Sequence, residues 1–193
     1  PRSKLNSSAQ NIARIHDDTK KDKLTQLVFI DLGVPSNAEL KAIKDGTFSE
    51  LDPKELSIYG KLKCKLMELG VPEDEIAFIH EANTDTEKQE LFNRVNHGDI
   101  RILIGSTAKM GQGTNVQKRL VAFHHLDVPW RPSDVEQREG RILRQGNQNK
   151  EVQIYAYVTE GSFDAAMWRV CEIKSSFMQQ ALSGDLSIRV MPD

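Results

Sequence analysis

Short apolar runs that alternate with helical segments constrain the fold of this chain more than any other feature of its sequence. The runs are Gln26–Asp31, Ile76–Ile79, Ile100–Ile104, Leu120–Leu126 and Val152–Val158. Apolar runs of this length, bounded by turn residues and separated by helices, are typical of buried strands in βαβ units. The pattern therefore predicts an α/β fold with a doubly wound, mostly parallel sheet and helices on both faces.

Helix start signals separate these runs. A Ser, Thr or Asp followed three residues later by Glu forms a capping box, which satisfies free N–H groups at a helix start. The three boxes are Asp52–Glu55, Thr84–Glu87 and Ser133–Glu136. Apolar periodicity predicts two further helices, over Ser7–Lys20 and from Ser162 to about Leu182.

We expect one domain over residues 1–193, because a chain of this length can bury a single sizeable core. Within it, Leu32–Leu51 is punctuated by Gly, Pro and Ser and is predicted to be an irregular insertion. The chain begins at Pro1 rather than at Met, so we expect it to be a piece of a longer protein.

Composition narrows the class of protein. Hydrophobic residues make up 38% of the chain and charged residues 28%, which is typical of a globular protein and excludes a disordered one. No apolar run approaches the roughly 20 residues of a membrane-spanning helix, so no membrane partner is predicted. The formal net charge of −2 means that any nucleic-acid surface is a local patch.

The cysteines and histidines predict neither a disulfide nor a metal site. Cys64 and Cys171 form no CxxC pair and fall on helical patterns, which favours small buried side chains in a reducing cytoplasm. None of the histidines has the spacing of metal ligands. The adjacent His124 and His125 lie on a predicted strand and should therefore point to opposite faces.

The segment QREGRILRQG, residues 137–146, concentrates arginines on a predicted helix. Gln137, Arg141 and Arg144 follow the spacing i, i+4, i+7 and share one face, and Arg138 adds a third guanidinium. Like charges at this spacing repel, and a facing polyanion relieves the repulsion, since the guanidinium fork suits phosphate oxygens. The alternative is a solvated surface helix whose arginines pair with local acids.

The segment STAKMGQGTNV, Ser106–Val116, follows a predicted strand and contains Gly111 and Gly113. Taken alone, the two glycines indicate either a tight turn or a dinucleotide-binding loop. The second alternative lacks a third glycine, because Val116 occupies that position.

Together these segments resemble a known family. QREGRILR resembles motif VI of superfamily 2 helicases, and Ser106–Val116 is similar to motif V of their Swi/Snf-type members, departing from it at Lys109 and Met110. QLVFID, HHLDVPWRP and EVQIYAYVTEGSFDAAM resemble the other segments of the C-terminal RecA-like lobe. Within the family, the likeness is closest to large helicase proteins of bacterial mobile elements and phages that also carry a DNA methyltransferase domain.

The resemblance implies roles for individual residues. Arg141 and Arg144 would be catalytic and would point at the γ-phosphate of ATP. The nucleotide side would comprise Gly111, Gly113, Asn115 and Gln137. The nucleic-acid backbone would be contacted by Ser106, Thr107 and Lys109. The expected nucleic acid is double-stranded DNA, although the residues themselves do not distinguish DNA from RNA.

The chain carries only half of such an ATP site. It contains no GxxxxGK[ST] loop, since Gly60-Lys61 lacks the upstream glycine, and no acidic pair follows an apolar strand to hold Mg²⁺. The resemblance therefore implies that an N-terminal RecA-like lobe of the same polypeptide binds most of the ATP and Mg²⁺. The alternative function is a degenerate helicase-like lobe that acts as a protein-interaction module.

Overall fold

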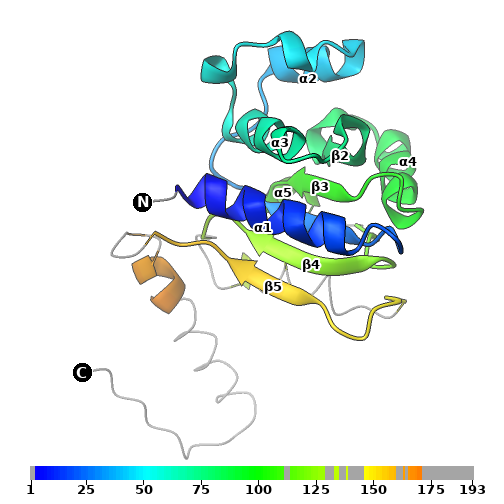
Figure 1. Ribbon diagram of the computed structural model, residues 1–193, viewed down its shortest axis with the longest axis vertical. Coiled ribbons are helices and arrows are strands. Elements are labelled where there is room, and N and C mark those ends of the chain that lie inside the picture. The colour runs from blue at the N-terminus through cyan, green and yellow to red at the C-terminus, as the bar shows by residue number, and fades with distance from the viewer. Residues whose placement is uncertain are drawn as a thin grey trace, which may run out of the picture.

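The computed structural model describes residues 3–110, 114–128, 133–134, 138, 146–159, 163 and 165–170. Within these ranges, five strands form one parallel sheet in the order β2-β3-β1-β4-β5. The strands are β1 (Thr25–Phe29), β2 (Ile76–Phe78), β3 (Ile102–Gly105), β4 (Leu120–His125) and β5 (Gln153–Ala156). Figure 1 shows β5, drawn in yellow, beside β4 at one edge of the sheet. The predicted fold class and strands are confirmed.

Helices pack on both faces of the sheet and bury a core on each. One core lies between the sheet and the helices α1 (Lys4–Asp18) and α3 (Ile58–Glu68). The other lies between the opposite face and α4 (Asp85–Asn96). Neighbouring residues of a strand serve different cores, because side chains alternate: Val28 belongs to the first core and Phe29 to the second.

The segment Leu32–Leu51 contains a regular helix, so the prediction of an irregular insertion is wrong for α2 (Asn37–Asp45). Ser36 and Glu39 form a capping box at its start. The buried carboxylate of Glu39 also accepts hydrogen bonds from the backbone N–H and the hydroxyl of Ser57, at 3.0 and 2.8 Å. This long-range contact holds α2 in place, and local composition does not reveal it.

The helix predicted to begin at the Asp52–Glu55 box begins later, at Ile58. The Ser57 side chain caps α3, and Glu39 holds Ser57 in position, so a tertiary contact overrides the local start signal. The box itself forms η2 (Pro53–Glu55), one of four short 3-10 helices in the part of the chain that the structure describes. The others are η1 (Phe48–Glu50), η3 (Glu73–Glu75) and η4 (Ile79–Glu81).

The remaining helix predictions have mixed outcomes. The Thr84–Glu87 box is confirmed at the start of α4. The Ser133–Glu136 box and the helix that follows it lie mostly outside the described residues. Of the predicted closing helix, residues 163 and 165–170 are described and are helical. In the described part of the chain, no helix is both long enough and apolar enough to span a membrane.

His124 is fully buried in β4 at the centre of a polar network. Its Nε2 lies 2.8 Å from Oε1 of Gln26, and its Nδ1 lies 2.8 Å from the hydroxyl oxygen of Tyr157. Gln26 in turn donates to the backbone carbonyl of Ile12 in α1 at 2.9 Å. Burial, and then the neighbouring His125, lower the pKa of His124 to about 3.

This low pKa predicts a loss of stability in mild acid. An unfolded histidine has a pKa near 6.5, so between about pH 3 and 6.5 only the unfolded chain takes up the proton. The contribution of His124 is complete above about pH 6.5 and decreases as the pH falls toward 3. The pKa values of His16 and His80 are also lowered, chiefly by burial. From pH 7.5 to 5.0, His124 should account for a loss of about 2 kcal/mol in the free energy of unfolding.

Urea unfolding at pH 7.5 and at pH 5.0 measures this loss. The His124→Gln variant, whose residue 124 does not titrate, is the control and should lose less stability than the wild-type protein between the two pH values. An equal free energy of unfolding at both pH values in the wild-type protein would mean that burial of His124 is not coupled to its protonation.

Candidate functional site

The carboxyl ends of the three central strands bring three polar residues together. The last residues of β1, β3 and β4 are paired in the sheet register: Phe29, Gly105 and His125. Asp31, Thr107 and Asp127 each lie two residues beyond one of these positions. Because parallel strands end at the same edge of a sheet, the three side chains lie together where ligands bind in doubly wound folds.

Arg138 joins this edge through all five of its N–H donors. Its Nε–H donates to Oγ1 of Thr107 at 2.6 Å. Its Nη2 group donates to Oδ2 of Asp31 at 2.5 Å and to Oδ1 of Asp127 at 3.2 Å. Its Nη1 group lies 2.9 Å from Nδ1 of His125 and donates to the backbone carbonyl of Asp127 at 3.3 Å. We call Arg138, Asp31, Thr107 and Asp127 the edge clamp.

Both carboxylates of the edge clamp accept hydrogen bonds from several donors. Asp31 also accepts from the backbone N–H and the hydroxyl of Thr107, at 2.7 and 2.8 Å. Oδ2 of Asp127 accepts from the backbone N–H groups of Asp31 and Leu32, at 2.5 and 2.7 Å. Burial alone would raise the pKa of Asp31, but the Thr107 N–H and the Arg138 charge outweigh it and lower that pKa.

The loop after β3 begins with the short helix α5 (Thr107–Met110). Ser106 accepts a hydrogen bond from the backbone N–H of Lys109 at 3.2 Å, and the Lys109 side chain is exposed. Met110 is only 1% exposed and packs against Gly105, where an added Cβ would lie 2.7 Å from its Cγ. Met110, one of the two departures from the family pattern, thus fixes the loop to the core.

The predicted nucleotide-side residues are only partly described. Asn115 is exposed, and its backbone carbonyl accepts from the side-chain amide of Asn96 at 2.7 Å. The remaining site residues lie outside the described residues, namely Gly111, Gly113, Gln137, Arg141 and Arg144. Their roles therefore stay predictions.

Arg138, which the sequence analysis counted as a third guanidinium beside Arg141 and Arg144, is an internal residue of the edge clamp. It is 1% exposed and all of its donors are used, so it neutralises Asp31 and Asp127 and has no donor left for phosphate. Periodicity along one helix does not reveal acids on distant strands. The sequence did contain one signal for these acids, because two apolar runs, QLVFID and LVAFHHLD, each end on an aspartate.

The described acids at this edge are not free to hold Mg²⁺. Among the residues that the structure describes, no group of three or more His, Cys, Asp or Glu side chains is placed to hold a metal ion. The carboxylates of Asp31 and Asp127 are already bonded to Arg138 and to backbone N–H groups. Mg²⁺ requires oxygen ligands, and these oxygens are engaged within the protein.

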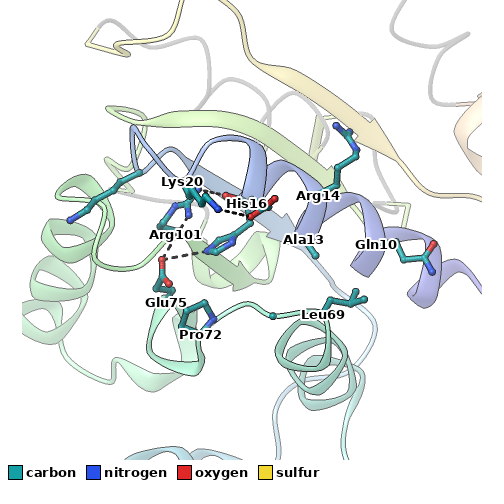
Figure 2. Close-up of a pocket in the computed structure, with 12 residues that line it drawn as sticks. Gln10, Ala13, Arg14, His16, Lys20, Leu69, Pro72, Glu75 and Arg101 are labelled. Atoms are coloured by element: carbon teal, nitrogen blue, oxygen red, sulfur yellow. Dashed lines mark hydrogen bonds and ion pairs between the residues drawn. The ribbon is translucent and has the colours of Figure 1, made fainter.

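A cavity of about 700 Å³ lies at the opposite edge of the sheet, where the strands begin. Figure 2 shows Arg101, His16 and Glu75 among its lining residues. Arg101 donates to the backbone carbonyls of His16 at 2.7 Å and Leu24 at 3.0 Å, and its Nη1 lies 3.9 Å from Glu75 Oε1. The guanidinium therefore caps the C-terminal end of α1.

Comparison with known proteins finds similarity to helicase C-terminal domains. Residues 54–146 match the helicase conserved C-terminal domain family. The C-terminal part of the Fun30 ATPase domain aligns with a TM-score of 0.56 and 16% identity, over 91% of this chain and 53% of that one. The helicase MrfA bound to DNA aligns with a TM-score of 0.53 and 15% identity, over 92% of this chain and 21% of that one. The Pyrococcus furiosus Hef helicase domain aligns with a TM-score of 0.52 and 14% identity, over 88% of this chain and 28% of that one.

A curated relative is similar over a shorter stretch. "Defense against restriction protein B" of Escherichia phage P1 is 32% identical over 75 residues, which are 39% of this chain and 3% of that protein. The chain thus spans a small fraction of this relative and at most about half of the aligned structures. The predicted RecA-like helicase C-terminal lobe is confirmed as the fold.

Proposed function

We propose that this chain is the second RecA-like lobe of a nucleic-acid-dependent ATPase, either a helicase or a DNA translocase. The edge clamp is the observation that carries the proposal. Arg138 ties its own segment, which continues to Arg141 and Arg144, to the carboxyl edge of the sheet. The loop that begins at Ser106 leaves the same edge. Arg138, three residues before Arg141, is thus bonded to Thr107 in that loop.

In this proposal, Arg141 and Arg144 contact the γ-phosphate of ATP and neutralise the charge that develops on it during hydrolysis. The residues on the nucleotide side are Gly111, Gly113, Asn115 and Gln137. The 193 residues contain no GxxxxGK[ST] loop, and the two described acids at the edge are engaged by Arg138. A first RecA-like lobe of the same polypeptide therefore supplies the phosphate loop and the Mg²⁺ ligands.

The nucleic-acid side of the proposed site is the loop of Ser106, Thr107 and Lys109. The structure of MrfA, whose fold this chain shares, contains DNA. Lys109 is exposed, and its charge suits a phosphate backbone. The hydroxyl of Thr107 is used by Asp31 and Arg138, so Lys109 carries the main electrostatic contact. The proposed substrate is double-stranded DNA.

The finer assignment rests on the resemblance of the motifs. A Swi/Snf-type ATPase, a DNA methyltransferase domain in the same polypeptide and a cytoplasmic location all belong to the proposal. The similarity to a phage protein is in keeping with a mobile-element origin. A degenerate lobe that only binds proteins has less support, because nothing in such a role calls for two arginines spaced as Arg141 and Arg144 are.

Replacing Lys109 by alanine in the two-lobed parent tests the nucleic-acid contact. If Lys109 contacts a backbone phosphate, affinity should fall by a similar factor for DNA of every sequence. The slope of log K against log salt should also become shallower by about one unit, because one fewer counterion is released. Fluorescence anisotropy titrations of duplex DNA at several salt concentrations measure both quantities.

Lys21→Ala is the matched control. Lys21 is exposed in the turn after α1, at the edge of the sheet where strands begin, so its loss removes the same charge from the opposite side. This variant should keep the wild-type salt slope. The contact assigned to Lys109 is wrong if its variant also keeps the wild-type slope while remaining folded.

A further inference from the structure

The cavity at the edge where the strands begin has no part in the proposed ATP or nucleic-acid site. It lies opposite the edge clamp, between α1 and the turn that follows α3. Its volume of about 700 Å³ falls within the range of small-molecule sites, which is roughly 300–1,000 Å³. The cavity is therefore large enough to hold a small ligand.

Arg101 has unused hydrogen-bonding capacity at one end of this cavity. The residue is only 2% exposed, and its Nε–H and Nη2 groups donate to the carbonyls of Leu24 and His16 and to the hydroxyl of Thr19. Its Nη1 group makes no hydrogen bond in the described part of the chain. Oε1 of Glu75 lies 3.9 Å from Nη1 and 3.4 Å from Nε2 of His16, so neither is a close ion pair. The two N–H groups of Nη1 therefore offer a place for a ligand oxygen, because a buried donor is stabilised by an acceptor.

The charges around the cavity favour an anion. Among the described residues that line it, four are cationic and two are acidic, namely Arg14, Lys20, Lys23, Arg101, Asp17 and Glu75. Lys23 is exposed and forms no ion pair within the ranges that the structure describes. The side chains of Lys20 and Asp17 are 3.2 Å apart but 70% and 73% exposed, so this pair is weak and leaves the lysine available.

The other end of the cavity is apolar. Ala13, Leu69 and Pro72 are among the residues that line it, and Figure 2 shows Ala13 and Leu69 away from the charged end at Arg101. Leu69 is 48% exposed, so the protein itself leaves much of this apolar surface uncovered. A ligand that fills both ends therefore has an anionic head and an apolar body.

We propose that this cavity binds a small phosphate monoester, with the phosphate at Arg101 and Lys23 and an apolar or aromatic body against Leu69 and Pro72. Phosphate suits the charged end better than a carboxylate does, because its terminal oxygens accept from the guanidinium and still face the lysine ammonium groups. The cavity lies at the edge of the sheet opposite the edge clamp, so this inference does not rest on the proposed function.

Phenyl phosphate and inorganic phosphate are the probes, titrated into the isotope-labelled chain of residues 1–193 and followed by NMR. The backbone amide signals of Gly70, Glu75 and Arg101 should shift saturably with both. Phenyl phosphate should bind at least about tenfold more tightly than inorganic phosphate, because its ring covers apolar surface at Leu69 and Pro72. Benzyl alcohol, which has the ring but no charge, should bind at least about tenfold more weakly than phenyl phosphate.

Two variants separate the two ends of the site. Lys23→Ala should weaken both phosphate probes by about threefold to tenfold, the effect of one partly exposed charge. Leu69→Ser should weaken phenyl phosphate by a similar factor and leave inorganic phosphate unchanged, since Leu69 meets only the ring. Lys21→Ala is the matched control, because Lys21 is exposed in the same turn as Lys23 but does not line the cavity. All three side chains are exposed, so the variants should fold, and melting curves check this.

Three results would overturn the proposal. If the three amide signals show no saturable shift with phenyl phosphate up to about 10 mM, the cavity holds only water. If Lys21→Ala weakens the probes as much as Lys23→Ala does, the binding is unspecific attraction to a basic surface. If an oligonucleotide with a terminal phosphate shifts the same signals at least about tenfold more tightly than phenyl phosphate, the cavity receives a nucleic-acid end and not a small molecule.

Discussion

Replacing Arg141 or Arg144 by alanine in the two-lobed parent should reduce nucleic-acid-stimulated ATP hydrolysis by about 10³-fold or more. An arginine that acts mainly on the transition state changes turnover far more than it changes binding of ATP. The Kd for ATP should therefore stay close to the wild-type value. Lysine at either position should restore little activity, because it keeps the charge but loses the planar fork that binds two phosphate oxygens.

Steady-state ATPase rates with saturating DNA, together with ATP titrations, measure these effects. Arg94→Ala is the matched control, since Arg94 is an exposed arginine on α4, away from the carboxyl edge of the central strands. It should keep normal turnover. If Arg141 and Arg144 only form surface ion pairs, their alanine variants will lose about 0–1 kcal/mol of stability and will hydrolyse ATP normally. That result would leave the protein-interaction module as the better explanation.

The chain of residues 1–193 on its own should fold and yet show no nucleic-acid-stimulated ATP turnover. Two cores and the parallel sheet are built entirely from residues of this chain, so we expect one cooperative unfolding transition. ATP should bind weakly, because the chain has no phosphate loop, and the described acids of the edge clamp are engaged by Arg138.

Calorimetric titration with ATP and an ATPase assay with and without duplex DNA measure the two properties. The two-lobed parent, assayed alongside, should show the stimulated activity that the chain lacks. Stimulated turnover by the pure chain would contradict the proposal that it carries only half of the ATP site. The Arg144→Ala variant of the chain is the control for a contaminating ATPase, because it should abolish any turnover that belongs to the chain itself. Joining the first lobe to this chain in one polypeptide should raise the rate by orders of magnitude, because two halves of a site are then held in one geometry.

The strands were predictable from the sequence to within two residues at each end. Runs such as Ile100–Ile104 are buried on both faces of a parallel sheet, so their apolar composition is sufficient to mark them. The start of α4 was predictable for a similar reason, because the Thr84–Glu87 capping box is formed by four consecutive residues. Local interactions decide these features.

Helix α2 and the start of α3 were not predictable in this way. The carboxylate of Glu39 caps its own helix through Ser36 and also binds Ser57, 18 residues further on. A local pattern contains no information about a contact at that separation. The Asp52–Glu55 box was therefore overridden by a start at Ile58.

For the candidate site, the sequence by itself predicted that the chemistry lies in two segments, the arginines of residues 137–146 and the loop after Ser106. Only the tertiary structure decided how they combine. The register of β1, β3 and β4 places Asp31, Thr107 and Asp127 side by side, and this arrangement draws Arg138 inward. Local sequence only placed that arginine beside Arg141 and Arg144. Burial next to two carboxylates makes it an internal clamp, because a buried charge is stable only where opposite charges and hydrogen-bond acceptors surround it.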